Sequence, residues 1–215
     1  MLLTTAYFPP VSWFAAVASE FTLSPDGVNP SMLTLEACEN YQKQSYRNRC
    51  RIYSASGAED LNVPVVHENG TFKLPITRIR IDYSVPWTLK TKRAISSAYD
   101  SSPYFEYYKD DIFAILDSQP ETLWELNLRL IEFFLKKTGI AADISFTQEF
   151  SLESQERDLR WAIHPKKPDM VLEELGLKKP YFQVFARKYG FISNLSIMDL
   201  LFNEGPESII YLKKF

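Results

Sequence analysis

Apolar and polar residues in the first 90 positions form short runs that predict strands and one helix. Residues 2–7 are an apolar run that ends at Pro9 and Pro10. Residues 12–18 then have the composition of a helix, and a proline close to the first helical turn is well tolerated. A strand, a sharp turn and a helix are the opening of an α/β unit. Further strands are predicted at residues 32–37, 49–53, 61–65 and 79–83, the last with the cleanest alternation.

The second half of the chain is predicted to be mainly helical. Helices are expected over residues 87–99, 103–117 and 119–137, an extended piece over 144–150, and tail helices from 196 and over 207–213. For the helix over 119–137, Ser118 and Glu121 are suited to a capping box and Gly139 to the C-terminal stop. Residues 151–168 are polar and predicted to form an exposed loop. The pattern predicts an α/β protein with a mixed sheet flanked by helices and a helical C-terminal half.

Composition limits the classes of protein that fit. The 215 residues suit a single domain over 1–215, and the net charge of -3 argues against a nucleic-acid-binding domain. Only two cysteines occur, Cys38 and Cys50, which favours a reducing compartment. We find neither a signal peptide nor 18 consecutive apolar residues, so we expect a cytoplasmic protein without a transmembrane segment.

A basic and polar run is the strongest candidate for substrate binding. Lys43, Arg47 and Arg49 occur here with Arg51, and if residues 47–53 are extended, the three arginines share one face. Guanidinium groups in that arrangement match the oxygens of phosphate or carboxylate. The alternative is a solvated strand face with salt bridges to Glu36, Glu39 or Asp82. Both interpretations stay open. The polar residues interspersed in the run are Gln44, Tyr46 and Asn48.

Other residues have chemistry that suits a site. Tyr7 lies at the turn from the first strand to the first helix, where ligands of α/β proteins bind, although core packing is the more common role of aromatic residues. Glu39 beside the basic run is a candidate general base, whereas Glu36 is expected to pair with arginine. His164 is a candidate for proton transfer, but a surface-loop position is the simpler interpretation, and His67 is expected to be exposed.

The tail invites a catalytic interpretation as well as a structural one. Ser196 and Asp199 match the pattern of a helix N-terminus, and we prefer this structural interpretation. A further hypothesis is that Asp199 braces the arginines across the core. The spacing of histidines and cysteines predicts no zinc site, and no phosphate-binding glycine loop occurs. We therefore expect neither a metal nor a cofactor.

Several segments together resemble the WbqC-like family of bacterial proteins. They are residues 6–14 (AYFPPVSWF), 39–49 (ENYQKQSYRNR), 62–65 (NVPV), 98–105, 180–185 (PYFQVF) and 194–206 (NLSIMDLLFNEGP). Thr5 and Ala6 stand where many members have Gln-Pro, Glu39 and Asn40 where many have Asp-Asp, and the region around His164 replaces a longer segment. The chain therefore resembles a short branch of the family.

The resemblance implies a role in O-antigen or capsule assembly. One hypothesis is a transferase acting on an activated sugar or amino sugar, with a nucleotide-sugar or another anionic small molecule as substrate. In it, Lys43, Arg47 and Arg49 hold the anion, Tyr7, Tyr46 and Asn48 orient the donor or acceptor, and Glu39 or His164 moves the proton. The other hypothesis is a non-catalytic binding or scaffold protein of the same pathway. A concave pocket around the basic run favours the enzyme, and a flat aromatic surface favours the scaffold.

Overall fold

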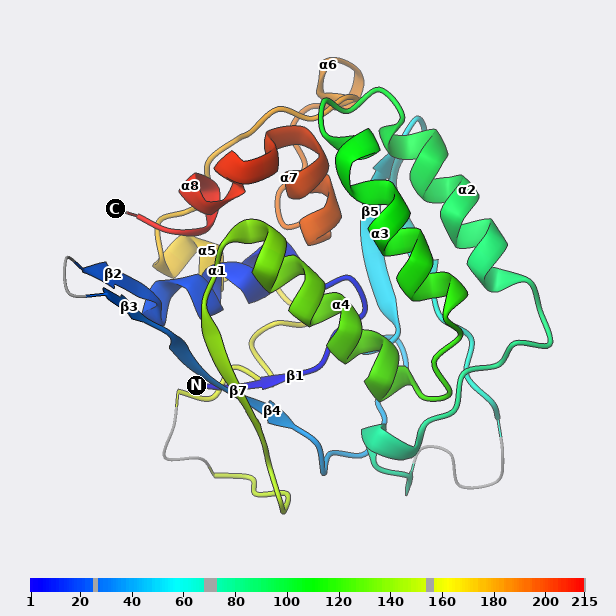
Figure 1. The fold of residues 1–215 in the computed structure, drawn as a ribbon, viewed down its shortest axis with the longest axis vertical. Coiled ribbons are helices and arrows are strands. Elements are labelled where there is room, and N and C mark those ends of the chain that lie inside the picture. The colour runs from blue at the N-terminus through cyan, green and yellow to red at the C-terminus, as the bar shows by residue number, and fades with distance from the viewer. Residues whose placement is uncertain (25–26, 68–72, 154–156, 215) are drawn as a thin grey trace.

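The computed structural model describes residues 1–24, 27–67, 73–153 and 157–214 (Figure 1). The strands are β1 (Leu2–Thr4), β2 (Thr22–Ser24), β3 (Gly27–Asn29), β4 (Ser31–Glu36), β5 (Arg49–Ser54), β6 (Gly57–Asn62) and β7 (Ala142–Phe146). The α-helices are α1 (Val11–Glu20), α2 (Trp87–Tyr99), α3 (Phe105–Asp117), α4 (Leu123–Thr138), α5 (Val171–Glu174), α6 (Ala186–Tyr189), α7 (Ile197–Glu204) and α8 (Ser208–Leu212). The 3-10 helices of the described residues are η2 (Ile76–Arg78) and η3 (Gly205–Glu207).

A three-stranded parallel sheet in the order β1-β4-β7 positions the candidate site. Leu3 of β1 is in register with Leu35 of β4, and Leu33 of β4 with Ile144 of β7. An isolated parallel bridge between Leu2 and Asp158 extends the pairing beyond β1. Because all these strands run in the same direction, their carboxyl ends lie at one edge, where open α/β sheets bind their ligands.

The α/β class is confirmed, with the strands divided among separate sheets. The parallel sheet is accompanied by two antiparallel hairpins, β2–β3 and β5–β6. In the second hairpin Arg51 lies opposite Asp60. Helices α2, α3 and α4 follow one another along the chain, and α2 packs against α3 and β5 (Figure 1). The predicted helix over 87–99 is confirmed at both ends.

Helix α7 lies in the centre of the packing, in contact with α1, α3 and α4. Its residues from 197 to 203 are all buried, because most of them are apolar and the two polar ones, Asp199 and Asn203, make hydrogen bonds inside the protein. The predicted N-cap is confirmed, since the Ser196 side chain accepts a hydrogen bond from the Met198 amide. Asp199 does not brace the arginines. Its Oδ2 accepts hydrogen bonds from the Tyr181 hydroxyl at 2.6 Å and from Gln183 Nε2 at 2.8 Å.

Residues 79–83, predicted as the best strand, do not form one. Ile81 makes an isolated bridge with Val65, and Arg80 makes another with Thr122. Ile79 and Ile81 are buried, so the alternation records one buried side of an irregular segment. Period-2 alternation reports burial, and a strand additionally requires a neighbour to pair with along its length.

Helix α4 begins later than predicted. Its N-cap is Thr122, whose side chain accepts a hydrogen bond from the Glu125 amide, while Glu125 Oε2 accepts from the Glu121 amide. Ser118 instead follows α3 as its C-cap. The Thr-x-x-Glu spacing at 122–125 is a capping pattern in its own right and agrees with the observed start. The predicted stop at Gly139, which has a φ of 73°, is confirmed.

Among the described residues, no helix combines the length and the apolar character needed to cross a membrane.

Candidate site at the carboxyl edge of the parallel sheet

Buried polar side chains gather where the parallel strands end. Glu36 is the last residue of β4 and is fully buried. Thr147, directly after β7, donates its hydroxyl to Glu36 Oε1 at 2.6 Å and accepts from the Ala37 amide at 2.9 Å. The Cys38 amide also donates to Glu36 Oε1, at 2.9 Å. These three hydrogen bonds, donated by the Thr147 hydroxyl and the amides of Ala37 and Cys38, therefore join the end of β4 to the end of β7.

Arg160 neutralises Glu36. Its Nη1 lies 2.6 Å from Glu36 Oε2, and its Nη2 lies 2.7 Å from Asp158 Oδ2. Burial raises the pKa of Asp158, but the hydrogen bonds and charge of Arg160 outweigh it, so the pKa is lowered overall. Glu36 therefore pairs with an arginine, as predicted, but with one outside the basic run.

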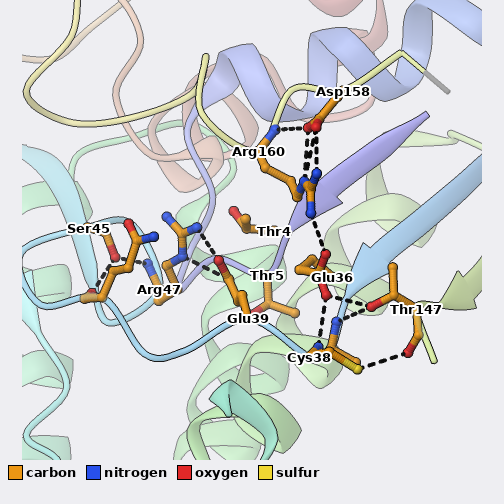
Figure 2. A network of polar contacts seen from close by, with 12 residues as sticks. Thr4, Thr5, Glu36, Cys38, Glu39, Ser45, Arg47, Thr147, Asp158 and Arg160 are labelled. Atoms are coloured by element: carbon orange, nitrogen blue, oxygen red, sulfur yellow. Dashed lines mark hydrogen bonds and ion pairs between the residues drawn. The ribbon is translucent and has the colours of Figure 1, made fainter. Parts of the chain in front are cut away.

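A second buried ion pair lies nearby, with Thr4 and Thr5 between the two groups in Figure 2. Arg47 holds Glu39 through two contacts, Nε to Oε1 at 3.0 Å and Nη2 to Oε2 at 2.6 Å. Burial raises the pKa of Glu39, although Arg47 lowers it in part. Asn127 of α4 fixes the backbone here by donating to the Arg47 carbonyl at 2.8 Å. Glu39 is thus a positioned carboxyl group that binds a proton more readily than an ordinary glutamate.

The predicted face of three arginines is wrong. Arg47 lies in the turn before β5 and is 1% exposed, whereas Arg49 and Arg51 lie on the strand and both pair with Asp60. The chain is not yet extended at residue 47, because residues 43–48 form turns in which Gln44 has a φ of 58°. Arg47 is therefore committed to Glu39 and does not form a clamp with the other two.

A cavity of about 400 Å³ opens beside Glu39. Its wall is formed by the segment 38–42, which follows β4, together with Phe150 and Trp161. Phe150 packs on the Arg160 guanidinium, with the carbon of that group 5.3 Å from the ring centroid. The ion pair that neutralises Glu36 thus also supports one aromatic wall of the cavity.

A second cavity, of about 250 Å³, adjoins the first. Both are lined by Tyr41. The second cavity is lined by four of the residues predicted to bind substrate, and across from them by the segment 62–65 and His67. These four residues are Lys43, Gln44, Asn48 and Arg49. The two cavities therefore differ in character, since one combines aromatic rings with a carboxyl group and the other is cationic and rich in amides.

Comparison with known proteins identifies the family of this chain. The profile of the WbqC-like protein family matches residues 30–172, about two thirds of the chain. This chain belongs to the WbqC-like protein family. The matched region includes both buried ion pairs and both cavities. An uncharacterized protein of Mycobacterium tuberculosis, Rv1507c, is 28% identical over 195 residues, which cover 80% of this chain and 84% of that protein. No solved structure matches.

Three of the predicted binding residues of this WbqC-like chain line neither cavity: Arg47, which is paired with Glu39, and the tyrosines Tyr7 and Tyr46. Tyr7 is fully buried, its amide donates to the Tyr46 carbonyl at 2.8 Å, and its ring packs edge-on against Phe8. Tyr46 is half-buried against the core, and burial raises its pKa to about 12. The structure places both tyrosines in packing positions.

His164 is half-buried near Arg47 and lines neither cavity. Burial lowers its pKa, and the charges of Arg47, Lys167 and Lys166 lower it further, so the neutral imidazole is favoured. Its Nδ1 accepts a hydrogen bond from the Lys166 amide at 3.2 Å. Its role in proton transfer stays a prediction. His67 is exposed, as predicted.

The sequence interpretation missed Arg160, Phe150 and Trp161. All three lie at or next to the segment 151–168, predicted to be an exposed loop, of which residues 154–156 lie outside the described part. Leu159, Arg160 and Ile163 are in fact buried. The apolar residues on either side of Arg160 were a signal that this loop folds onto the protein.

The described residues contain no group of three or more histidine, cysteine, aspartate or glutamate side chains arranged to hold a metal ion.

Proposed function

We propose that this WbqC-like chain is a transferase that acts on an activated sugar or amino sugar in bacterial surface-polysaccharide biosynthesis, in O-antigen or capsule assembly. The observation that carries the proposal is a buried, positioned carboxyl group, Glu39, in the wall of a concave cavity with aromatic sides. Concave pockets with a few convergent polar groups are the usual form of small-molecule sites.

The walls of the first cavity suit a sugar ring. Tyr41, Phe150 and Trp161 offer aromatic surface to the apolar faces of a pyranose, and Trp161 and Tyr41 also have polar ends for its hydroxyl groups. Asn40 and Gln42 add amide donors and acceptors along the same segment. A volume of about 400 Å³ is within the usual range for small-molecule pockets.

Glu39 is suited to proton transfer because its pKa is raised by burial. In the proposed step, its carboxylate accepts a proton from an acceptor hydroxyl or amine as that oxygen or nitrogen bonds to C1 of the sugar. The bond from C1 to the phosphate oxygen breaks, and the departing phosphate group takes the electron pair. Arg47 keeps the carboxylate in place and supplies the opposite charge.

The alternative is a non-catalytic binding or scaffold protein of the same pathway. Large exposed apolar side chains favour it, since Tyr107 is 75%, Leu152 79% and Phe182 56% exposed. Exposed aromatic side chains such as that of Tyr107 are typical anchors of protein interfaces. The transferase is preferred because the basic run lines a cavity, which is the arrangement that favours an enzyme.

The test measures release of nucleotide from a panel of nucleotide-sugars and nucleotide-amino sugars, with water in place of the unidentified acceptor. We expect release by the wild type and a loss of 10²- to 10⁴-fold in Glu39→Gln, the range for removal of a general base. Glu59→Gln is the matched control, because Glu59 is an exposed glutamate on β6, away from both cavities. No release from any compound would overturn the transferase proposal in favour of the scaffold, whereas full activity in Glu39→Gln would overturn the role of Glu39 as the general base.

A further inference from the structure

We infer that the second cavity is a phosphate subsite that binds the diphosphate or nucleotide part of the ligand, and that Arg49 and Lys43 are its anion-binding residues. The link from this phosphate to a sugar in the first cavity rests on the proposed function, whereas the binding of phosphate does not. The inference moves the anion away from Arg47, whose guanidinium is buried and paired with Glu39.

The charge balance around the second cavity is positive. Lys43 and Arg49 line it, and no aspartate or glutamate does so among the described residues. The nearest acidic partner, Asp60, is shared by Arg49 and Arg51 at 3.3 and 3.0 Å, so one carboxylate faces two guanidinium groups. An anion entering the cavity therefore meets uncompensated positive charge.

Arg49 is held in place and still has donors to offer. Its Nε donates to Asn62 Oδ1 at 3.0 Å and its Nη1 lies 3.3 Å from Asp60, both on the neighbouring strand β6. Its Nη2 makes no hydrogen bond with a described residue. A guanidinium positioned in advance by two partners loses little freedom when it binds phosphate oxygens.

Lys43 complements Arg49. It is exposed and forms no ion pair within the described part of the chain. The adjacent Gln44 accepts a hydrogen bond from Lys166 Nζ at 2.7 Å, which brings a third cation to the rim. Several cations converging on one concave surface are typical of sites for phosphate esters.

Asn48 adds an unpartnered acceptor to a residue in the wall of the second cavity. Its Nδ2 donates to the Val63 carbonyl at 3.0 Å, which fixes the amide plane. Its Oδ1 is buried and has no hydrogen-bond partner among the described residues, although Asn48 lines the cavity. Buried acceptors are normally satisfied, and a hydroxyl or amino group of a nucleotide would satisfy this one.

The shared wall at Tyr41 makes one ligand across both cavities feasible. The phosphate of an activated sugar is bonded directly to the sugar, so the two subsites of such a ligand must adjoin. The two cavities satisfy this condition because Tyr41 lines both.

The test is calorimetric titration of the full chain with inorganic pyrophosphate at low ionic strength. We expect binding by the wild type and at least tenfold weaker binding by Lys43→Ala and by Arg49→Ala. The matched control is Arg187→Ala, since Arg187 is an exposed arginine that lines neither cavity and does not share the Asp60 carboxylate. We expect its affinity to stay within twofold of the wild type.

The outcomes separate this inference from the proposed function. Absence of pyrophosphate binding by the wild type, or an equal loss in Arg187→Ala and Arg49→Ala, would overturn the phosphate subsite. If the predicted pattern is observed but no nucleotide-sugar is turned over, the subsite stands and the transferase proposal falls. Circular dichroism of each variant establishes that a lost affinity does not arise from unfolding.

Discussion

Arg160 Nη1 lies 2.6 Å from Glu36 Oε2, and both side chains are about 1% exposed. This contact joins residue 160 to the end of β4, across 124 positions of the sequence. Because Trp161 is the next residue, the same contact holds an aromatic wall of the first cavity beside the carboxyl edge of the sheet. The ion pair thus links the fold to the candidate site.

Removal of Arg160 is predicted to destabilise the protein strongly. Arg160→Ala leaves the buried Glu36 carboxylate without its cation, and breaking one side of a buried ion pair costs about 3–5 kcal/mol. Urea unfolding at neutral pH measures this free energy. Arg157→Ala is the control, because among the described residues the Arg157 side chain donates a hydrogen bond to the half-buried Ser19 hydroxyl alone, at 3.3 Å. Equal stability of the two variants would contradict the account of Arg160.

Asp199 is predicted to make stability depend on pH between about 4 and 6. Burial raises its pKa to about 6 in the folded protein, from about 3.9 in the unfolded chain. Between these values the folded state holds more protons, so the free energy of unfolding contributed by Asp199 falls as pH rises, and it levels off above pH 6. A difference of two pKa units corresponds to about 2–3 kcal/mol.

The matched variant is Asp199→Asn, which keeps an acceptor for Tyr181 and Gln183 and does not titrate. Melting temperatures are measured for both proteins from pH 4 to 8. As pH rises from 4 to 6, the melting temperature of the variant is expected to rise relative to that of the wild type. Above pH 6 the difference between the two melting temperatures should stay constant. Parallel curves over the whole range would show that Asp199 keeps an ordinary pKa.

Two glycines with positive φ are predicted to respond differently to alanine. At Gly139, φ is 73° and a Cβ meets nothing within 4 Å, so Gly139→Ala is expected to cost about 1–2 kcal/mol for the left-handed backbone alone. At Gly205, φ is 54° and a Cβ would lie 2.5 Å from Cδ1 of the Tyr104 ring. Steric overpacking adds about 1–3 kcal/mol there. Chemical denaturation of both variants checks this order, and a smaller loss at Gly205 would contradict the packing of Tyr104 on it.

Ionisation of Glu39 is predicted to determine the pH below which the rate of any catalysed reaction falls. A general base must be ionised, so the rate should fall as pH falls through the pKa of Glu39. Because burial raises that pKa, the midpoint should lie above the ordinary glutamate value of about 4.3. The measurement is the rate of nucleotide release from pH 4 to 8. A rate that stays constant down to pH 4 would exclude Glu39 as the base.

The sequence predicted the parts of the fold that depend on local signals. Helix α2 was predicted with the correct bounds, and the end of α4 was located by Gly139, whose lack of a side chain permits the positive φ of a helix stop. The cap at Ser196 was also found, since a serine before an apolar helix satisfies backbone donors within its own turn. Each of these signals operates within a few residues.

Long-range pairing was not predictable in this way. The alternation of residues 79–83 gave no information on whether a partner strand lay beside it. Likewise, the spacing of Arg47, Arg49 and Arg51 could not reveal that the turn at residues 43–48 rotates Arg47 into the core toward Glu39. The ion pair between Arg160 and Glu36 depends on the pairing of Asp158 with Leu2 of β1, which brings residue 160 next to the sheet. Local sequence patterns contain no information on such a tertiary contact.

The most direct test of the central claim is calorimetric titration with the nucleotide-sugar that raises the melting temperature most in a thermal-shift screen. One ligand bound across both cavities predicts that Lys43→Ala and Trp161→Ala each weaken its binding at least tenfold, whereas Lys43→Ala weakens pyrophosphate binding and Trp161→Ala does not. Failure of every nucleotide-sugar to bind, or unchanged affinity in Trp161→Ala, would contradict a single site formed by the two cavities.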